Sequence, residues 1–149
     1  MHQLRRWLPL AALFLTACEE ARGIPGVWTG SFRTIANLVQ PSRMYSFTLT
    51  LTETDVGVIS GGGRLLNSPP DTLIAQSTTY FAVTVTGAHA HPSITLAIAP
   101  GGAQAMNFTG TVDGTLTRMD GVVIGSGFIG DSLHFVRNTP QSSARITAP

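Results

Sequence analysis

Apolar residues alternate with small hydroxyl residues through much of the chain. The run YSFTLTLT at residues 45–52 alternates at every position, and the runs at 80–86 and 93–99 follow the same pattern. Successive side chains of a β-strand point to opposite faces, so each run predicts a strand with one apolar and one polar face. There is hardly any helical periodicity around these runs.

Turn residues separate the alternating runs at the short spacing that β-hairpins need. We predict turns at Thr54-Asp55 with Gly57, Pro100-Gly101-Gly102, Asp113-Gly114 and Gly130-Asp131. The predicted strands cover residues 26–35, 44–53, 57–66, 80–88, 93–99, 105–112, 116–125 and 131–137. The expected fold class is all-β, a small antiparallel up-and-down barrel of about eight strands. A two-sheet β-sandwich is the alternative.

The first residues resemble the signal peptide of a bacterial lipoprotein. A basic head at residues 1–6 precedes an apolar run at 7–17, which is shorter than the roughly 20 residues that cross a bilayer. The run ends in LTAC, which resembles the lipobox, whose cysteine is lipidated and becomes the first residue of the mature protein. The resemblance implies a membrane anchor on Cys18. In ordinary secretion, which is the alternative, Cys18 would be a free thiol.

This anatomy divides the chain into consecutive parts. We expect a signal peptide at 1–17, a lipidated tether at 18–25, the barrel domain at 26–137 and a flexible tail at 138–149. Glu19 stands at the position where the sorting pattern of the family has Asp in proteins retained in the inner membrane. The expected location is the cell envelope, and the outer membrane, on its periplasmic or surface face, is favoured over the inner membrane.

Charge is sparse and nearly balanced. Only 11% of the residues are charged, against roughly 25% in an average soluble protein. Removal of residues 1–17 takes away Arg5 and Arg6, which leaves seven of the nine basic residues against eight acidic residues. Nucleic-acid binding depends on clustered basic charge, so this balance argues against it.

The two ends of the predicted barrel domain carry two short sequence patterns that belong together. The sequence GVW at 26–28 opens the first strand, and FVR at 135–137 closes the last. This pairing resembles the calycin group, which includes lipocalins, avidins and intracellular fatty-acid-binding proteins. The resemblance implies that Gly26 and Trp28 sit at a closed end of the barrel, with Arg137 over the indole in a cation–π contact. Alternatively, Trp28 is an ordinary core residue and Arg137 a solvated strand end.

Few residues point to chemistry. His89 and His91 are two residues apart, a spacing that can bind zinc on one face of a strand. A third ligand would have to come from His134 or Asp131, so we expect no metal site and interpret the pair as exposed turn histidines. The glycine runs lack the helix and lysine of phosphate-binding loops, and no nucleophile motif is present. We therefore expect neither a cofactor nor an enzyme.

These patterns favour a lipid-anchored envelope protein whose calycin-like barrel binds a small apolar ligand. Inward-facing residues are expected to line the interior, namely Tyr45, Phe47, Leu49, Phe81 and Val83. The alternative is a ligand-free β domain of the envelope with a structural or protein-interaction role, such as an inhibitor. The expected partners are the membrane, through the lipid on Cys18, and either a small apolar ligand or another envelope protein.

Overall fold

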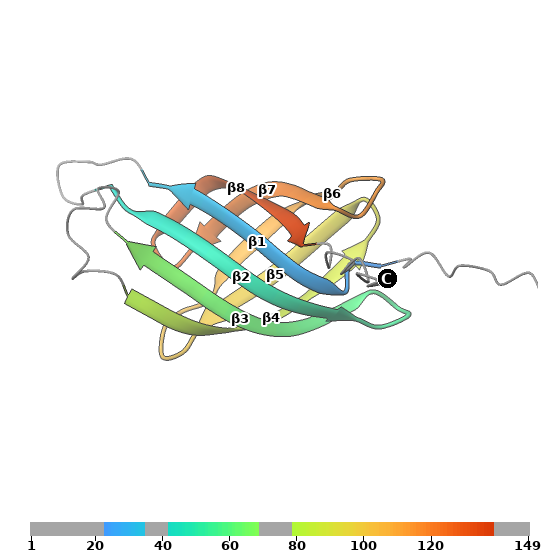
Figure 1. The fold of residues 1–149 in the computed structure, drawn as a ribbon, viewed down its shortest axis with the longest axis horizontal. Helices are drawn as coiled ribbons and strands as arrows, with labels where there is room; N and C mark the ends of the chain where they lie inside the picture. Colours follow the sequence, from blue (N-terminus) through green and yellow to red (C-terminus); the bar gives the residue numbers. More distant parts are fainter. Residues whose placement is uncertain (1–22, 35–41, 69–78, 139–149) are drawn as a thin grey trace, which may run out of the picture.

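The strands of the protein close into one barrel (Figure 1). The computed structural model describes residues 23–34, 42–68 and 79–138. The strands are β1 (Gly26–Arg33), β2 (Met44–Glu53), β3 (Val58–Ser68), β4 (Thr79–Ala90), β5 (Ser93–Pro100), β6 (Met106–Val112), β7 (Arg118–Gly125) and β8 (Phe128–Asn138). Each strand pairs antiparallel with the next, and β8 pairs antiparallel with β1. The predicted up-and-down barrel is confirmed, and the alternative of a two-sheet sandwich is wrong.

Several expectations concern segments outside the described residues. These are the signal peptide at 1–17, Cys18 with Glu19, and the tail from residue 139 onward. Among the residues that the structure describes, none belongs to a helix that is long and apolar enough to cross a membrane.

The alternation along the sequence determines which side chains enter the barrel. In β2, Phe47, Leu49 and Leu51 are buried, whereas Thr48 and Thr50 between them are exposed. The same alternation in the other strands builds one apolar core, and no polar or charged residue of the described ranges is fully enclosed in it. The strand faces therefore follow the sequence pattern.

Aromatic side chains fill the middle of the barrel. The ring centroid of Phe135 lies 5.9 Å from that of Phe47 and 5.4 Å from that of Phe108, and both pairs meet edge to face. All three rings are at most 2% exposed. At this level the interior is packed with side chains, as in many small barrels.

The last hairpin differs from the prediction. Gly130 and Asp131, predicted to form its turn, lie within β8, and the chain turns at Ser126 and Gly127 instead. Ser126 has a φ of 51° and Gly127 a φ of 92°, in the left-handed region that tight turns use. The pairing of β7 with β8 shifts its register nearby, which is a β-bulge. A glycine signal in the sequence does not distinguish a turn from a bulge.

The start of β1 and the end of β8 form the closed end of the barrel. Trp28 is fully buried, and its indole N–H donates a hydrogen bond of 2.8 Å to the carbonyl of Ile24. Ile24 is also fully buried, so the packed structure begins within the segment expected to be a tether. Arg137 lies over Trp28, with Cζ 5.9 Å from the ring centroid, and its guanidinium donates a hydrogen bond to the carbonyl of Pro25.

Candidate functional site

The open end of the barrel, where β1 ends and β2 begins, carries two adjoining hollows. The outer hollow has a volume of about 400 Å³, and its lining includes Thr34, Arg43, Tyr45, Asn67, Ser126 and Phe128. The inner hollow has a volume of about 170 Å³, and its lining adds Leu65, Phe81, Pro100, Ala103 and Met106. Tyr45, Asn67, Ser126 and Phe128 line both hollows, which we treat together as the open-end site.

Three aromatic rings, those of Phe32, Tyr45 and Phe128, pack together at the open-end site. Phe32 stacks on Tyr45 with a centroid distance of 5.2 Å. Phe128 meets Phe32 at 5.1 Å and Tyr45 at 5.0 Å, edge to face in both cases. The rings brace one another, so Tyr45 and Phe128, which line the hollows, offer them an ordered apolar surface.

Arg43 is held at the rim of the open-end site. Its Nε donates a hydrogen bond of 2.7 Å to Oδ1 of Asn67, which faces it from β3. Its backbone is also fixed, because Thr34 N donates to Arg43 O at 2.9 Å and Arg43 N donates to Thr34 Oγ1 at 3.0 Å. The guanidinium is therefore positioned before anything binds, which lowers the entropic cost of using it for recognition.

The structure divides the predicted lining residues into two groups. Tyr45 and Phe81 line the open-end site. Phe47, Leu49 and Val83 lie deeper in the apolar core and are 2%, 0% and 4% exposed. The first group can reach a ligand in the hollows, whereas the second supports the barrel wall beneath them.

Sequence reasoning missed most of the other lining residues of this site, among them Arg43, Asn67 and Phe128. Phe128 directly follows Gly127, and this large apolar residue after a glycine was a signal for the start of the next strand, which the structure confirms as the start of β8. Arg43 and Asn67 are 24 residues apart and carry no motif. Only the register of β2 with β3 brings them together.

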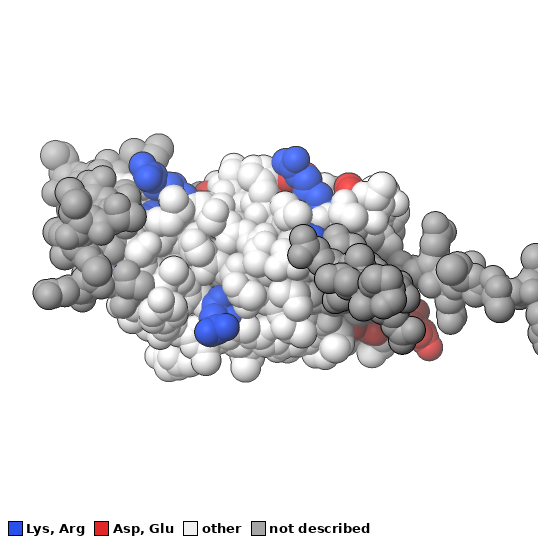
Figure 2. Space-filling model, viewed as in Figure 1, with Lys and Arg blue, Asp and Glu red and all other residues white. Residues whose placement is uncertain are grey.

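Charge is unevenly distributed between the two ends of the barrel. Four of the five described acidic residues lie in the half of the barrel that contains the closed end, namely Glu53, Asp55, Asp113 and Asp120. That half also contains two arginines, Arg118 and Arg137, so its acids outnumber its arginines, whereas Arg33 and Arg43 lie at the open end, beside the β1–β2 connection. On the face shown in Figure 2, most of the acidic atoms accordingly lie toward the right-hand, closed end.

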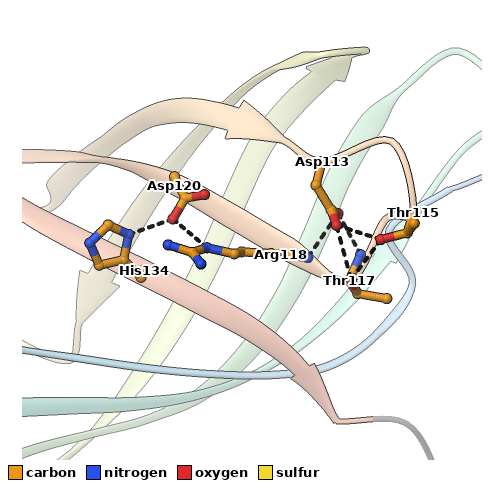
Figure 3. A network of polar contacts seen from close by, with 6 residues as sticks. All are labelled: Asp113, Thr115, Thr117, Arg118, Asp120 and His134. Atoms are coloured by element: carbon orange, nitrogen blue, oxygen red, sulfur yellow. Dashed lines mark hydrogen bonds and ion pairs between the residues drawn. The ribbon is translucent and has the colours of Figure 1, made fainter.

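A second polar cluster lies on the outer wall of β7 and β8 (Figure 3). Oδ1 of Asp120 accepts a hydrogen bond of 2.7 Å from Arg118 Nε and lies 2.5 Å from Nδ1 of His134. Burial acts to raise the pKa of Asp120, but hydrogen bonds and charges from Arg118 and His134 outweigh it and hold the pKa below its ordinary value. The Asp120 carboxylate is therefore a fixed negative charge that orients the imidazole.

Asp120 and His134 belong to a row of paired residues that crosses β7, β8 and β1 and ends at the hydroxyl of Ser31. Asp120 pairs with His134 across β7 and β8, and His134 pairs with Ser31 across β8 and β1. A carboxylate, an imidazole and a hydroxyl in this order are the groups of nucleophilic catalysis. In the described part of the chain no hydrogen bond joins His134 to Ser31, and 54% of the imidazole surface is exposed. The row lacks the contact that activates a nucleophile.

Asp113 organises the loop between β6 and β7, also drawn in Figure 3. Its carboxylate accepts hydrogen bonds from the hydroxyl of Thr115 and from the backbone N–H groups of Arg118 and Thr117, the last two at 2.9 and 2.7 Å. These bonds favour the ionised form and hold the pKa of Asp113 far below its ordinary value. Its role is to fix the turn.

The closed end holds a pair of ionisable groups whose side chains are mostly shielded from solvent. Nδ1 of His89 lies 2.7 Å from Oε1 of Glu53, and the two side chains are 6% and 11% exposed. The other carboxylate oxygen of Glu53 accepts a hydrogen bond of 2.8 Å from the N–H of Ile24. The interpretation as an exposed turn histidine is therefore wrong for His89, because β4 extends past it, whereas His91 lies exposed in the turn.

Metal ligands do not converge in the parts of the chain that are described. Within residues 23–34, 42–68 and 79–138, no group of three or more His, Cys, Asp and Glu side chains is arranged to hold a metal ion. His89 and His91 lie on the same edge of the barrel, with ring centroids 6.0 Å apart.

Comparison with known proteins identifies no protein to which this chain is similar. No protein-family model matches the chain, and neither a curated protein nor a solved structure matches it.

Proposed function

We propose that the protein is a lipid-anchored binding protein of the cell envelope that holds a small apolar or amphipathic molecule at the open end of its barrel. The observation that carries the proposal is the outer hollow of about 400 Å³ with an ordered aromatic floor. Ligand pockets commonly have volumes of about 300–1,000 Å³ and combine apolar walls with a few placed polar groups. The open-end site has both properties.

The proposal includes a calycin-like identity for the barrel. Two observations support it: the closed antiparallel barrel itself, and the position of Arg137 over the buried indole of Trp28 at the closed end. The lipid on Cys18 is supported by the resemblance of the sequence LTAC to a lipobox, and the outer-membrane location is supported by Glu19, which directly follows that cysteine. Because the middle of the barrel is packed with side chains, we propose binding at the open end rather than in a deep central cavity.

A ligand-free interaction domain is the second candidate function. The filled middle of the barrel favours it, and so do apolar side chains on the outer wall. Ile129 is 94% exposed and Ile124, its partner across β7 and β8, is 54% exposed. Exposed apolar residues that neighbour each other are typical of protein contact surfaces. In this case the functional surface is the outer wall of β7 and β8, and not the open-end site.

Native mass spectrometry of the processed protein, purified from membranes, tests the two candidates. We expect a bound small molecule in the wild type and its loss in Ala103→Trp, because the new indole fills the inner hollow, which Ala103 lines. Thr84→Trp adds the same side chain to an exposed position on the outer wall of β4 and serves as the matched control. A stoichiometric protein partner without any small molecule would support the interaction domain and overturn the binding proposal.

A further inference from the structure

The open-end site contains one charged side chain among its described lining residues. Arg43 lines the outer hollow, and the other lining residues of both hollows are polar but neutral, or apolar. No ion pair joins Arg43 to a carboxylate within the described residues. Asp131, the acidic residue in the open half of β8, lines neither hollow. The site therefore carries a positive charge that the described protein leaves available.

The contact with Asn67 decides which edge of Arg43 is available. Asn67 Oδ1 occupies the Nε–H, and no hydrogen bond among the described residues involves the two terminal nitrogens of the guanidinium. A guanidinium presents its N–H groups as a planar fork that matches the two oxygens of a carboxylate or phosphate. The held side chain thus offers part of this fork to an anion at the rim, close to the hydroxyl groups of Thr34 and Ser126 that line the same hollow.

Apolar groups continue inward from this charge. Leu65, Phe81 and Met106 line the inner hollow, and Tyr45 lines both hollows. A molecule whose anionic group meets Arg43 would place an attached hydrocarbon chain among these residues. The volume of about 170 Å³ limits the buried part to a short chain or a chain end.

We infer that the ligand of the open-end site is an anionic amphiphile, with its charged head on Arg43 and its apolar end in the inner hollow. This inference rests on the proposed function, since it names the chemical class of ligand for the same site. The uneven distribution of charge supports it, because Arg33 and Arg43 lie at the open end, whereas in the half that contains the closed end the four described acids outnumber the two arginines, Arg118 and Arg137. The electric field of this charge distribution attracts anions to the open end and repels them from the closed end.

Titration calorimetry with matched amphiphiles tests the inference on the purified, processed protein. Octanoate, 1-octanol and octylamine share one chain and differ in charge, and octyl phosphate separates phosphate from carboxylate recognition. We expect an anionic probe to bind about tenfold more tightly than 1-octanol, as a charge-assisted hydrogen bond predicts. Octylamine is expected to bind least, and added salt should weaken only the binding of the anions.

Arg43→Gln provides the decisive comparison. We expect it to remove the preference for the anion, by about tenfold, and to leave the binding of 1-octanol unchanged. Arg64→Gln removes an exposed charge from the outer wall of β3 and is the matched control, which should behave as the wild type. Circular dichroism of each variant checks that the barrel is intact.

The outcomes separate this inference from the proposed function. Equal affinity for octanoate, octyl phosphate and 1-octanol, unchanged in Arg43→Gln, would overturn the inference and leave the proposed binding site standing. Binding of no probe by a folded protein would overturn both. Tight binding of one anion that Arg43→Gln weakens and Arg64→Gln does not would support both.

Discussion

Single side chains hold the two ends of this barrel in different ways. At the closed end, Trp28 and Ile24 are fully buried, and the only polar atom of the indole donates its hydrogen bond to a backbone carbonyl. At the open end, Arg43 is tied to Asn67 by one hydrogen bond and otherwise borders a hollow. A residue whose polar groups are all engaged supports the fold, whereas a partly engaged one beside a hollow is available for binding.

Asp113 gives a pH-dependent prediction at this scale. Because its pKa is lower in the folded protein than in the unfolded chain, ionised Asp113 stabilises the fold above its ordinary pKa of about 4. This stabilisation is lost as the pH falls toward the lowered pKa. We expect Asp113→Asn to lower the midpoint of thermal unfolding at neutral pH, and the difference from the wild type to shrink as the pH is lowered below about 4.

Thermal unfolding followed by circular dichroism over a pH series measures this difference. Asp55→Asn is the control, since Asp55 lies exposed in the turn between β2 and β3 and accepts no side-chain hydrogen bond from the described residues. A difference between Asp113→Asn and the wild type that stays constant from neutral to acidic pH would contradict the assignment.

At the scale of elements, β2 and β3 approach each other unusually closely. Gly61 and Gly63 face the barrel interior, where a Cβ on Gly63 would lie 2.0 Å from the carbonyl oxygen of Thr48 and 2.9 Å from the Cα of Leu49. A Cβ on Gly61 would likewise lie 2.2 Å from the carbonyl oxygen of Thr50. Glycine in a strand usually weakens it, but here it permits a close backbone contact.

Gly63→Ala should therefore destabilise the barrel by about 1–3 kcal/mol, the usual cost of overpacking a filled interior. The added methyl group must displace backbone atoms of β2, which cannot move without breaking the ladder. Chemical denaturation measures the change in the free energy of unfolding. Gly114→Ala, in a turn where a Cβ would meet nothing within 4 Å, should change stability by less than about 0.5 kcal/mol. Equal effects of the two substitutions would contradict the close approach of β2 and β3.

At the scale of the whole molecule, the barrel has a packed middle between a plugged end and a hollow end. Phe135 is fully buried and contacts the rings of Phe47 and Phe108, so it belongs to the packed part. Phe128 is 8% exposed and lines the open-end site. Stability and binding are thus assigned to different levels of the same barrel.

Substitution of these two phenylalanines checks that assignment. Phe135→Ala should cost about 3–5 kcal/mol of unfolding free energy, because it leaves an enclosed cavity in the core. Phe128→Ala should cost less, about 1–2 kcal/mol, because the space it leaves opens into a hollow that water can enter. Urea denaturation of both variants provides the values. A larger loss of unfolding free energy for Phe128→Ala than for Phe135→Ala would show that the open end is part of the stabilising core.

The local sequence pattern alone determined where most strands lie and which face of each strand is buried. The unbroken alternation at 45–52 placed Phe47, Leu49 and Leu51 on one face, and the structure buries all three. The prediction succeeds because the side chains of a strand alternate between its two faces regardless of which strand it pairs with. Burial away from water is favourable only for the apolar face. Eight such strands with short turns also favoured a closed barrel, in which every strand edge finds a partner.

Contacts between distant residues were decided only by the tertiary structure. The hydrogen bond of Arg43 with Asn67 and the pair of His89 with Glu53, which are 24 and 36 residues apart, depend on the registers of β2, β3 and β4. The same holds for the choice of a turn at Ser126 and the bulge beside it. Sequence periodicity specifies the face of a side chain but not its neighbour on the next strand, because register depends on the packing of the entire closed sheet. The candidate binding site was therefore decided by barrel closure, whereas the strand faces beneath it were already determined by the sequence.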